Sequence, residues 1–359
     1  MSFSLEKLFV DVFAPRKGEI VTIMIDLPHG GILDIPAWQA RRQMAEDWRR
    51  EVERFSPKYG MHVSALVSYE ATGMSNSDLP EYGLCAGRKV RLDEVARDST
   101  IIISMPQFSA TAPLVQLTRK YETLRVASMP KVTRAMQETA LSADYSQIAV
   151  TCNRLAQLFD QSNGIEVKFS TGYVCYFDKS DRKPARRDDG ILHPGGGMGT
   201  SRLSNLPAGE VFVTPNELSD SKTAGKIPVN YGSETAAFVV RNNRIVDVIG
   251  KGSMAAQKRQ EFRAEKALCN IAEVAIGCND KAVVTGIVLE DEKAGFHWAH
   301  GRSEHLGGTV APKDFSSPDK VLHEDIVYAR GNPIVCARLD FILADGTRKT
   351  GIVDGVLVP

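Results

Sequence analysis

The chain has 359 residues, of which 43% are hydrophobic and 25% are charged, and these fractions exclude a disordered or fibrous protein. It carries 44 Lys and Arg residues against 44 Asp and Glu residues, so no net field of one sign would attract nucleic acid or an anionic membrane. A single hydrophobic core rarely grows beyond roughly 250–300 residues, and the length therefore favours two domains.

The first part of the chain alternates between strand-like and helix-like segments. Residues 19–27 (EIVTIMIDL) are a β-branched apolar run, and residues 35–55 repeat apolar side chains at helical spacing. Further strands are expected at 62–69, 101–103 and 124–128, and further helices at 112–121 and 133–142. Repeated β-α units predict a mostly parallel sheet. We therefore expect residues 1–150 to form an N-terminal α/β domain.

The remainder of the chain reads mostly as strand. The pattern predicts a helix at 146–159, strands at 164–170 and 172–177, a polar loop at 179–209 and a second helix at 253–275. We therefore expect residues 151–359 to form a mixed β-rich domain, which carries the metal-binding and catalytic residues. The expected fold class is α/β plus β-rich.

Three features predict a cytoplasmic location. No stretch reaches the ~18 consecutive apolar residues of a membrane span. The N-terminal segment MSFSLEKLFVDVF contains acidic residues and no small-residue cleavage site. The six cysteines are scattered without a C-x-x-C motif, which is typical of core residues in a reducing compartment.

Histidines and carboxylates concentrate near the C-terminal end. Four of the seven histidines lie between residues 297 and 323, close to several acids. Nitrogen and oxygen ligands without cysteine suit zinc, cobalt, manganese or iron(II). Residues 321–328 (VLHEDIVY) read as a strand, so His323 and Asp325 share one face and Glu324 points to the other. The alternative is a surface strand with a chance His-x-Asp pattern.

Three glutamates strengthen this pattern. Glu292 precedes His297, and the turn at Gly295 would allow the two side chains to converge. Glu210 and Glu273 are each flanked by apolar residues, where a charge is costly unless it is paired or bound to metal. The alternative for each of these two is an amphipathic element with its charge facing water.

An ordered set of segments resembles the aminopeptidase T / aminopeptidase S family, the thermophilic-type leucyl aminopeptidases, which are two-metal exopeptidases. The segments are ASMPKVTRAM (127–136) with DYSQ (144–147), NLPAGEVFVTP (205–215), AEVAIG (272–277), EDEKAGFHWAHG (290–301) and LHEDIV (322–327). The resemblance covers roughly residues 120–359.

This resemblance implies a metalloaminopeptidase, which hydrolyses the N-terminal peptide bond of a short peptide or a related amide. The implied ligands of two divalent metal ions, zinc or cobalt with manganese or iron as alternatives, are Glu210, Glu273, His297, His323 and Asp325. Glu292 is the implied catalytic carboxylate, which takes a proton from the metal-activated water. The resemblance also implies a homodimer that encloses the site, so we expect a homodimer.

Two alternatives remain open. A mononuclear iron(II) ring-cleaving dioxygenase that acts on dihydroxypyridine is similar to the same family, and here its set would be His297, His323 and Asp325. The additional glutamates favour the two-metal hydrolase over it. A non-catalytic family member is the other alternative, because Glu304 stands where the family has a tyrosine.

Overall fold

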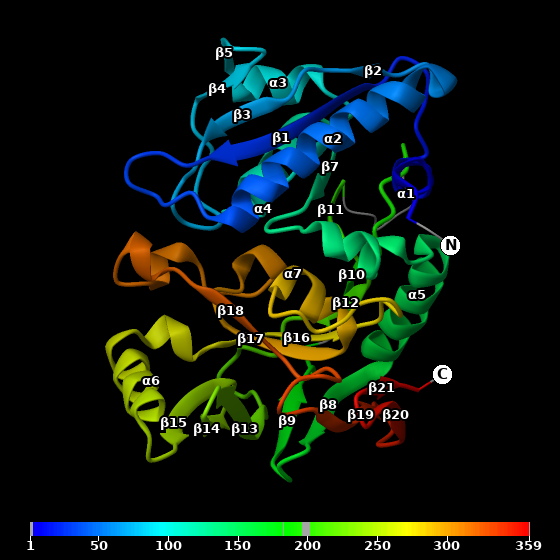
Figure 1. The fold of residues 1–359 in the computed structure, drawn as a ribbon. Coiled ribbons are helices and arrows are strands. Elements are labelled where there is room, and N and C mark those ends of the chain that lie inside the picture. The colour runs from blue at the N-terminus through cyan, green and yellow to red at the C-terminus, as the bar shows by residue number, and fades with distance from the viewer. Residues whose placement is uncertain (1–2, 182, 196–201, 359) are drawn as a thin grey trace. The chain divides into compact units, whose positions relative to one another are not determined.

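The computed structural model describes residues 3–181, 183–195 and 202–358 (Figure 1). The chain divides into two units, and each unit is formed by several segments. Unit 1 comprises Met1–Val150, Asp188–Gly209 and Asn279–Lys281. Unit 2 comprises Thr151–Arg187, Glu210–Cys278 and Ala282–Pro359. The fold is mixed α/β, with one parallel/antiparallel sheet and further antiparallel sheets.

Unit 1 is built on an eight-stranded sheet flanked by helices. Its strands are β1 (Ile20–Leu27), β2 (His62–Val63), β3 (Val67–Glu70), β4 (Tyr82–Cys85), β5 (Arg88–Arg91), β6 (Ile101–Ser104), β7 (Arg125–Ser128) and β11 (Leu203–Asn205). Its helices are α1 (Leu5–Phe13), α2 (Pro36–Tyr59), α3 (Leu92–Asp98) and α4 (Thr111–Lys120). The order is β11-β7-β6-β1-β3-β4-β5, with β2 beside β1. All pairs are parallel except those that β4 forms with β3 and β5.

The local patterns explain most of unit 1. The apolar run in β1 is buried along nearly its whole length, as expected for a strand covered on both faces. The apolar stripe of α2, which includes Trp38, Trp48 and Phe55, is buried. The helix predicted at 133–142 is wrong. This segment forms two short 3-10 turns, η1 (Arg134–Gln137) and η2 (Ala140–Ser142). Thr139 between them has φ −118° and ψ −120°, outside the helical region.

Unit 2 contains two sheets. The five-stranded sheet has the order β10-β12-β16-β17-β18, and the eight-stranded sheet has the order β15-β14-β13-β9-β8-β19-β20-β21. The first comprises β10 (Arg186–Asp188), β12 (Glu210–Val213), β16 (Ile271–Gly277), β17 (Phe296–Gly301) and β18 (His323–Val327). The second comprises β8 (Ser162–Phe169), β9 (Val174–Asp178), β13 (Ala224–Tyr231), β14 (Glu234–Arg241), β15 (Arg244–Ile249), β19 (Cys336–Leu343), β20 (Arg348–Val353) and β21 (Val356–Leu357).

The remaining helices lie between and beside these strands in the chain. They are α5 (Tyr145–Gln161), α6 (Ser253–Ala264), the 3-10 turn η3 (Lys266–Cys269), α7 (Val288–Asp291), and the 3-10 turns η4 (Glu292–Ala294), η5 (Glu304–Leu306), η6 (Pro312–Asp314) and η7 (Pro318–Lys320). Helix α5 confirms the helix predicted at 146–159. The predicted polar loop at 179–209 contains two short strands, β10 and β11, and its residues 182 and 196–201 lie outside the described residues.

The single helix predicted at 253–275 is wrong in its second half. Helix α6 ends at Ala264, because Glu265 is extended with φ −124° and ψ 98°. After the turn η3, the chain enters β16, in which every residue is buried. The apolar sequence of β16 suits a central strand, which β12 and β17 cover on its two edges. This difference matters because Glu273 lies on that strand and not on a helix.

An aromatic cluster joins the two sheets of unit 2. Phe169 of β8 and Phe177 of β9 lie against Phe296 of β17, each at a ring-centroid distance of 6.2 Å. Trp298 Nε1 donates to Tyr328 Oη at 3.1 Å. Even-numbered residues of β17 therefore face the core between the sheets. Because side chains alternate along a strand, odd-numbered residues of β17 face the opposite side.

Among the described residues, no helix combines the length and the apolar character that a bilayer span requires.

Candidate metal centre

The strand register of the five-stranded sheet gathers the predicted ligands on one face. Glu273 of β16 pairs with Ala299 of β17, and Ala299 pairs in turn with Asp325 of β18. These three residues form a row across the sheet, so their side chains point to the same side. His297 lies two positions before Ala299 and shares that side. The small side chain of Ala299 leaves room between the carboxylates and the imidazole.

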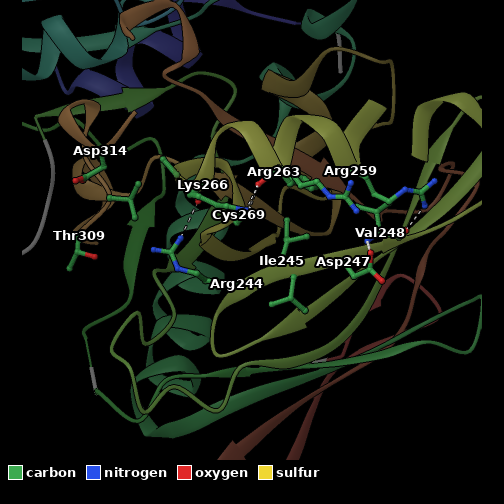
Figure 2. Close-up of a pocket in the computed structure, with 14 residues that line it drawn as sticks. Arg244, Ile245, Asp247, Val248, Arg259, Arg263, Lys266, Cys269, Thr309 and Asp314 are labelled. Atoms are coloured by element: carbon green, nitrogen blue, oxygen red, sulfur yellow. Dashed lines mark hydrogen bonds between the residues drawn. The ribbon is translucent and has the colours of Figure 1, made fainter. Parts of the chain in front are cut away.

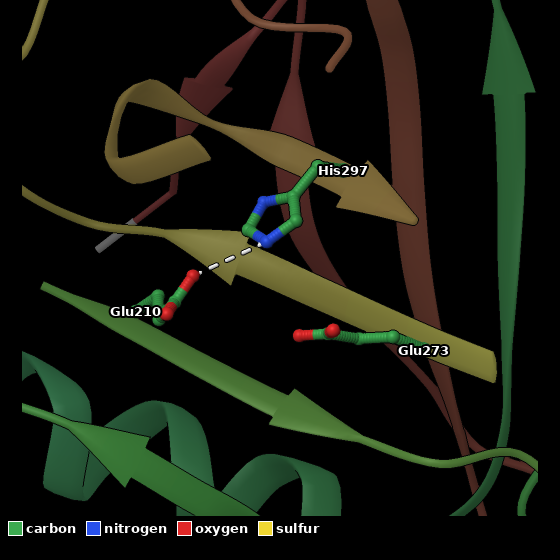
Figure 3. Close-up of side chains that lie close together, drawn as sticks. All are labelled: Glu210, Glu273 and His297. Carbon is green, nitrogen blue, oxygen red and sulfur yellow. Dashed lines mark ion pairs between the residues drawn. The ribbon is translucent and has the colours of Figure 1, made fainter. Parts of the chain in front are cut away.

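Glu210 and His323 lie on the same face of the sheet, because side chains alternate along each strand. Glu210, the first residue of β12, pairs with Gly277, which is in phase with Glu273 on β16. His323 of β18 pairs with Gly301, which is in phase with His297 on β17. Figure 3 shows the side chains of Glu210, Glu273 and His297 converging from three neighbouring strands.

Three overlapping groups of potential ligand atoms result, each with all its atoms within 4.8 Å of one another. The groups are Glu210 with Glu273 and His297, Glu273 with His323 and Asp325, and Glu292 with His297 and Asp325. The structure therefore brings all six predicted site residues together. Their assignment as metal ligands and as a catalytic carboxylate stays a prediction.

Two backbone carbonyls orient the imidazoles. His323 Nδ1 lies 2.7 Å from the carbonyl oxygen of Arg302, and His297 Nδ1 lies 3.3 Å from that of Gly295. A carbonyl accepts only from N–H, so each Nδ1 carries a proton, and in the neutral imidazole that binds a metal each Nε2 is the electron-pair donor. This is the arrangement by which proteins hold metal-binding histidines.

The Nε2 atoms face carboxylates. His323 Nε2 lies 3.1 Å from Glu273 Oε2 and 3.4 Å from Asp325 Oδ1. His297 Nε2 lies 3.2 Å from Glu210 Oε2 but is not aligned with any acceptor among the described residues as a hydrogen bond requires. A buried nitrogen in this state, surrounded by carboxylate oxygens, suits a divalent metal ion. The donor set of this site thus fits a metal.

Glu292 reaches this face from the 3-10 turn η4, which lies directly on β16. A Cβ atom on Gly277 would stand 2.2 Å from the carbonyl oxygen of Glu292 and 2.4 Å from the carbonyl carbon of Lys293. Gly277 N also donates to the carbonyl oxygen of Gly295 at 2.8 Å. The absence of a side chain at Gly277 therefore allows the turn to approach the strand.

Replacing Gly277 with alanine is expected to displace η4, because the atoms in the way are backbone atoms. We expect a destabilisation of about 1–3 kcal/mol, typical of overpacking, together with weaker metal binding. Urea unfolding and a metal titration measure the two effects. Gly232→Ala is the control, since its Cβ meets no atom within 4 Å. Its φ of +74° strains an alanine, so this variant should lower stability as well but leave metal affinity unchanged. Wild-type metal affinity in Gly277→Ala would show that the close approach does not position the site.

Lys293 is a site residue that sequence reasoning missed. Its side chain is 0% exposed, and Nζ lies 2.6 Å from Glu210 Oε1 and 2.6 Å from Glu292 Oε1. A lysine next to acids in a polar stretch is typical of a solvated surface. The sequence shows only that Lys293 stands between Glu292 and the turn at Gly295. This position does not reveal that its side chain is buried.

Burial dominates the acid-base properties of this group. It raises the pKa of Glu292 to about 8, although Lys293 opposes the shift. Burial also acts to raise the pKa of Glu210, but Lys293 and His297 outweigh it and hold this pKa below its usual range. Burial acts to lower the pKa of His297, but Glu210 and the other carboxylates raise it to about 9. Burial likewise raises the pKa of Glu273, so Glu292 and Glu273 are the two carboxyls of the group whose protonated form is favoured.

The neighbouring polar residues lie outside the group. His300, on the core face of β17, is buried, with Nδ1 2.9 Å from the carbonyl oxygen of Leu268 and Nε2 3.1 Å from Glu324 Oε2. Glu324 thus points away from His323 and Asp325, as the alternation along the strand predicts. Glu304, at the position of the family tyrosine, accepts a hydrogen bond from Arg302 Nε at 2.7 Å.

Comparison with known proteins gives a fold-level likeness. No family model matches the chain, and no curated protein matches it. Among solved structures, the chain is similar to 2,5-dihydroxypyridine dioxygenase from Pseudomonas putida KT2440, with a TM-score of 0.62 and 14% sequence identity. The likeness covers 99% of this chain and 96% of that chain. At this identity it shows the fold.

These findings correct the sequence-based function. The resemblance to the aminopeptidase T / aminopeptidase S family, and with it the metalloaminopeptidase and hydrolase assignments, is wrong, because the matched structure is a dioxygenase and nothing points to an aminopeptidase. The hydrolase was favoured because Glu210 and Glu273, as implied metal ligands, and Glu292, as the implied catalytic carboxylate, accompany the His, His and Asp set. In the structure, Glu210 and Glu292 are paired with the buried ammonium group of Lys293. The homodimer stays a prediction.

Proposed function

We propose that this protein is a mononuclear iron(II) dioxygenase that cleaves the ring of a small hydroxylated aromatic compound of the dihydroxypyridine type. In this proposal His297, His323 and Asp325 hold the metal. The observation that carries the proposal is the ion pairing of Lys293 with Glu210 and Glu292, together with the fold-level likeness to a dioxygenase of this type.

The charges of the site favour one metal over two. The four carboxylates outnumber the one ammonium group by three negative charges. With both imidazoles neutral, one divalent cation would leave a single net negative charge in the site. A second divalent ion would have to bind the carboxylates of Glu210 and Glu292, which Lys293 already pairs with.

The remaining ligands have the composition of a 2-His-1-carboxylate site. Two neutral imidazoles and one carboxylate leave coordination positions open, and iron(II) held in this way supplies dioxygen activation. Asp325 lies in one group of potential ligands with His323 and in another with His297. It is therefore the carboxylate that both histidines share. Glu273 lies 3.1 Å from His323 Nε2 and is within reach as a further oxygen donor.

Glu292 and Lys293 would handle protons at this site. Glu292 holds a proton near neutral pH and can exchange it with a ring hydroxyl of a bound substrate. Lys293 stays charged between two carboxylates and fixes the position of the Glu292 carboxyl group. The two residues would therefore orient a hydroxylated ring and control its protonation.

The proposal is tested with protein prepared without oxygen and reconstituted with iron(II). We expect about one iron per chain by elemental analysis, as a three-residue site binds one ion. We also expect oxygen uptake with 2,5-dihydroxypyridine, together with loss of the ring absorbance. Two tightly bound metals per chain and no oxygen uptake with dihydroxypyridines would refute the proposal.

Replacing Glu292 with glutamine is expected to slow turnover while the metal is retained. The amide has nearly the shape of the carboxyl group but cannot transfer its proton. We expect kcat to fall by about 10²–10⁴-fold, the usual contribution of general acid-base catalysis. Glu166→Gln is the control, because Glu166 pairs with Arg348 and neither residue contacts the site. Unchanged kcat in Glu292→Gln with full iron content would remove Glu292 from the mechanism.

A further inference from the structure

A pocket separate from the metal centre lies elsewhere in unit 2. It has a volume of about 700 Å³ and is lined by residues of β15, α6, η3 and the segment 309–314 (Figure 2). None of the six predicted metal-site residues lines it. A ligand in this pocket would therefore contact a different set of side chains from those of the metal centre.

The charge of this pocket is unusual for a protein with no net charge. Its charged lining residues are four cations and two acids, namely Arg244, Arg259, Arg263, Lys266, Asp247 and Asp314. Within the part of the chain that the structure describes, none of the four cations has a carboxylate at ion-pair distance. The lining therefore carries two more positive than negative side chains, and the described residues hold none of its cations in an ion pair.

Backbone carbonyls anchor two of the guanidinium groups. Arg259 Nη1 donates to the carbonyl oxygens of Val248 and Gly250 at 2.8 and 3.0 Å. Arg244 Nη1 donates to the carbonyl oxygen of Lys266 at 3.1 Å. Each guanidinium has five N–H donors, so these bonds restrain the groups while other donors remain for a ligand. Restraint before binding lowers the entropy that a ligand must overcome.

The two acids of the pocket are already engaged by the backbone. Asp247 Oδ1 accepts from Val248 N at 2.8 Å, and Asp314 Oδ2 accepts from Ala311 N at 2.8 Å. Buried apolar side chains, including Ile245 and Phe262, form part of the wall. The pocket thus offers charged donors beside an apolar surface.

We propose that this pocket binds a small organic anion with two or more negative charges, carried on phosphate or carboxylate groups. Planar guanidinium groups bind both oxyanions with paired hydrogen bonds, and the apolar wall accommodates the carbon skeleton. Because no residue is shared with the metal centre, this binding site does not depend on the proposed dioxygenase activity.

Isothermal titration calorimetry of the full-length, metal-loaded protein tests the site with ADP and citrate as probes. ADP presents phosphate groups and citrate presents carboxylate groups, so comparing the two titrations identifies the preferred anion. Adenosine is the uncharged control. We expect binding of at least one anion, weakening as NaCl is added, and no binding of adenosine. The absence of binding by both anions at millimolar concentration would overturn the proposal.

A double variant distinguishes this pocket from chelation at the metal centre. Arg263→Gln with Lys266→Gln removes two exposed cations and should raise Kd by about tenfold or more, since a charge-assisted hydrogen bond contributes about 1.5–3 kcal/mol. The matched control, Lys251→Gln with Lys349→Gln, removes two exposed cations outside the pocket and should leave Kd unchanged. An equal loss in both double variants, or no loss in the first, would contradict a site in this pocket.

Discussion

Replacing His323 with alanine is expected to leave the protein folded but unable to retain its metal. His323 Nε2 is held toward Glu273 and Asp325 by the contact of Nδ1 with the carbonyl oxygen of Arg302. The substitution removes one of three proposed ligands. Loss of an outer partner of a metal ligand typically costs about 10–100-fold in affinity, so the loss of a ligand itself should cost more.

The measurement is iron content after gel filtration, with circular dichroism to verify the fold. His62→Ala is the matched control, because His62 is an exposed histidine on β2 in unit 1 and should retain the wild-type iron content. Oxygen uptake should disappear in His323→Ala together with the metal. Wild-type iron content in this variant would exclude His323 as a ligand and would leave the proposed three-residue site incomplete.

Replacing Lys293 with methionine is expected to destabilise the metal-free protein strongly. Methionine fills a similar volume but leaves Glu210 and Glu292 without the ammonium group that lies 2.6 Å from each. Removing one partner of a buried ion pair typically costs about 3–5 kcal/mol, because the other charge stays buried and unpaired. A divalent ion in excess should restore part of the lost stability, since it can occupy the position of the ammonium group.

Urea unfolding of the metal-free protein, with and without added manganese, measures this effect. Lys58→Met is the control, because Lys58 pairs with Glu6 on the surface and exposed pairs contribute little to stability. Adding Glu210→Gln to Lys293→Met removes the unpaired charge, because the pKa of Glu210 lies below its usual range, and should recover part of the stability. A Lys293→Met variant as stable as wild type would mean that the ammonium group does not compensate these carboxylates, and the argument for a single metal would fail.

The error in function has a specific physical origin. A His, His and Asp set is common to the two-metal and one-metal alternatives, so the choice rested on the number of additional carboxylates. The amino-acid sequence shows that Glu210 and Glu292 exist but not what neutralises them. Lys293 reads as a surface residue because lysines are rarely buried. Only its burial shows that a cation of the protein already compensates the two carboxylates.

The sequence predicted the orientation of some site residues better than the helices and strands that carry them. Local alternation in residues 321–328 correctly placed His323 and Asp325 on one face, because a strand has a period of two. The same reasoning assigned Glu273 to a helix ending at 275, since a short apolar segment does not distinguish a buried strand from a buried helix. The expectation that Glu273 lies near the other carboxylates was right, whereas its structural element was wrong.

By itself, the sequence determined the features that depend on local patterns: the strand β1, the helices α2 and α5, and the shared face of His323 and Asp325. The tertiary structure decided the features that depend on strand register and close approach. Pairing of β12, β16, β17 and β18 brings together side chains that are distant in the chain. The absence of a side chain at Gly277 lets η4 lie on the sheet and bury Lys293 between two carboxylates. Such contacts are set by packing between elements, which no local period encodes.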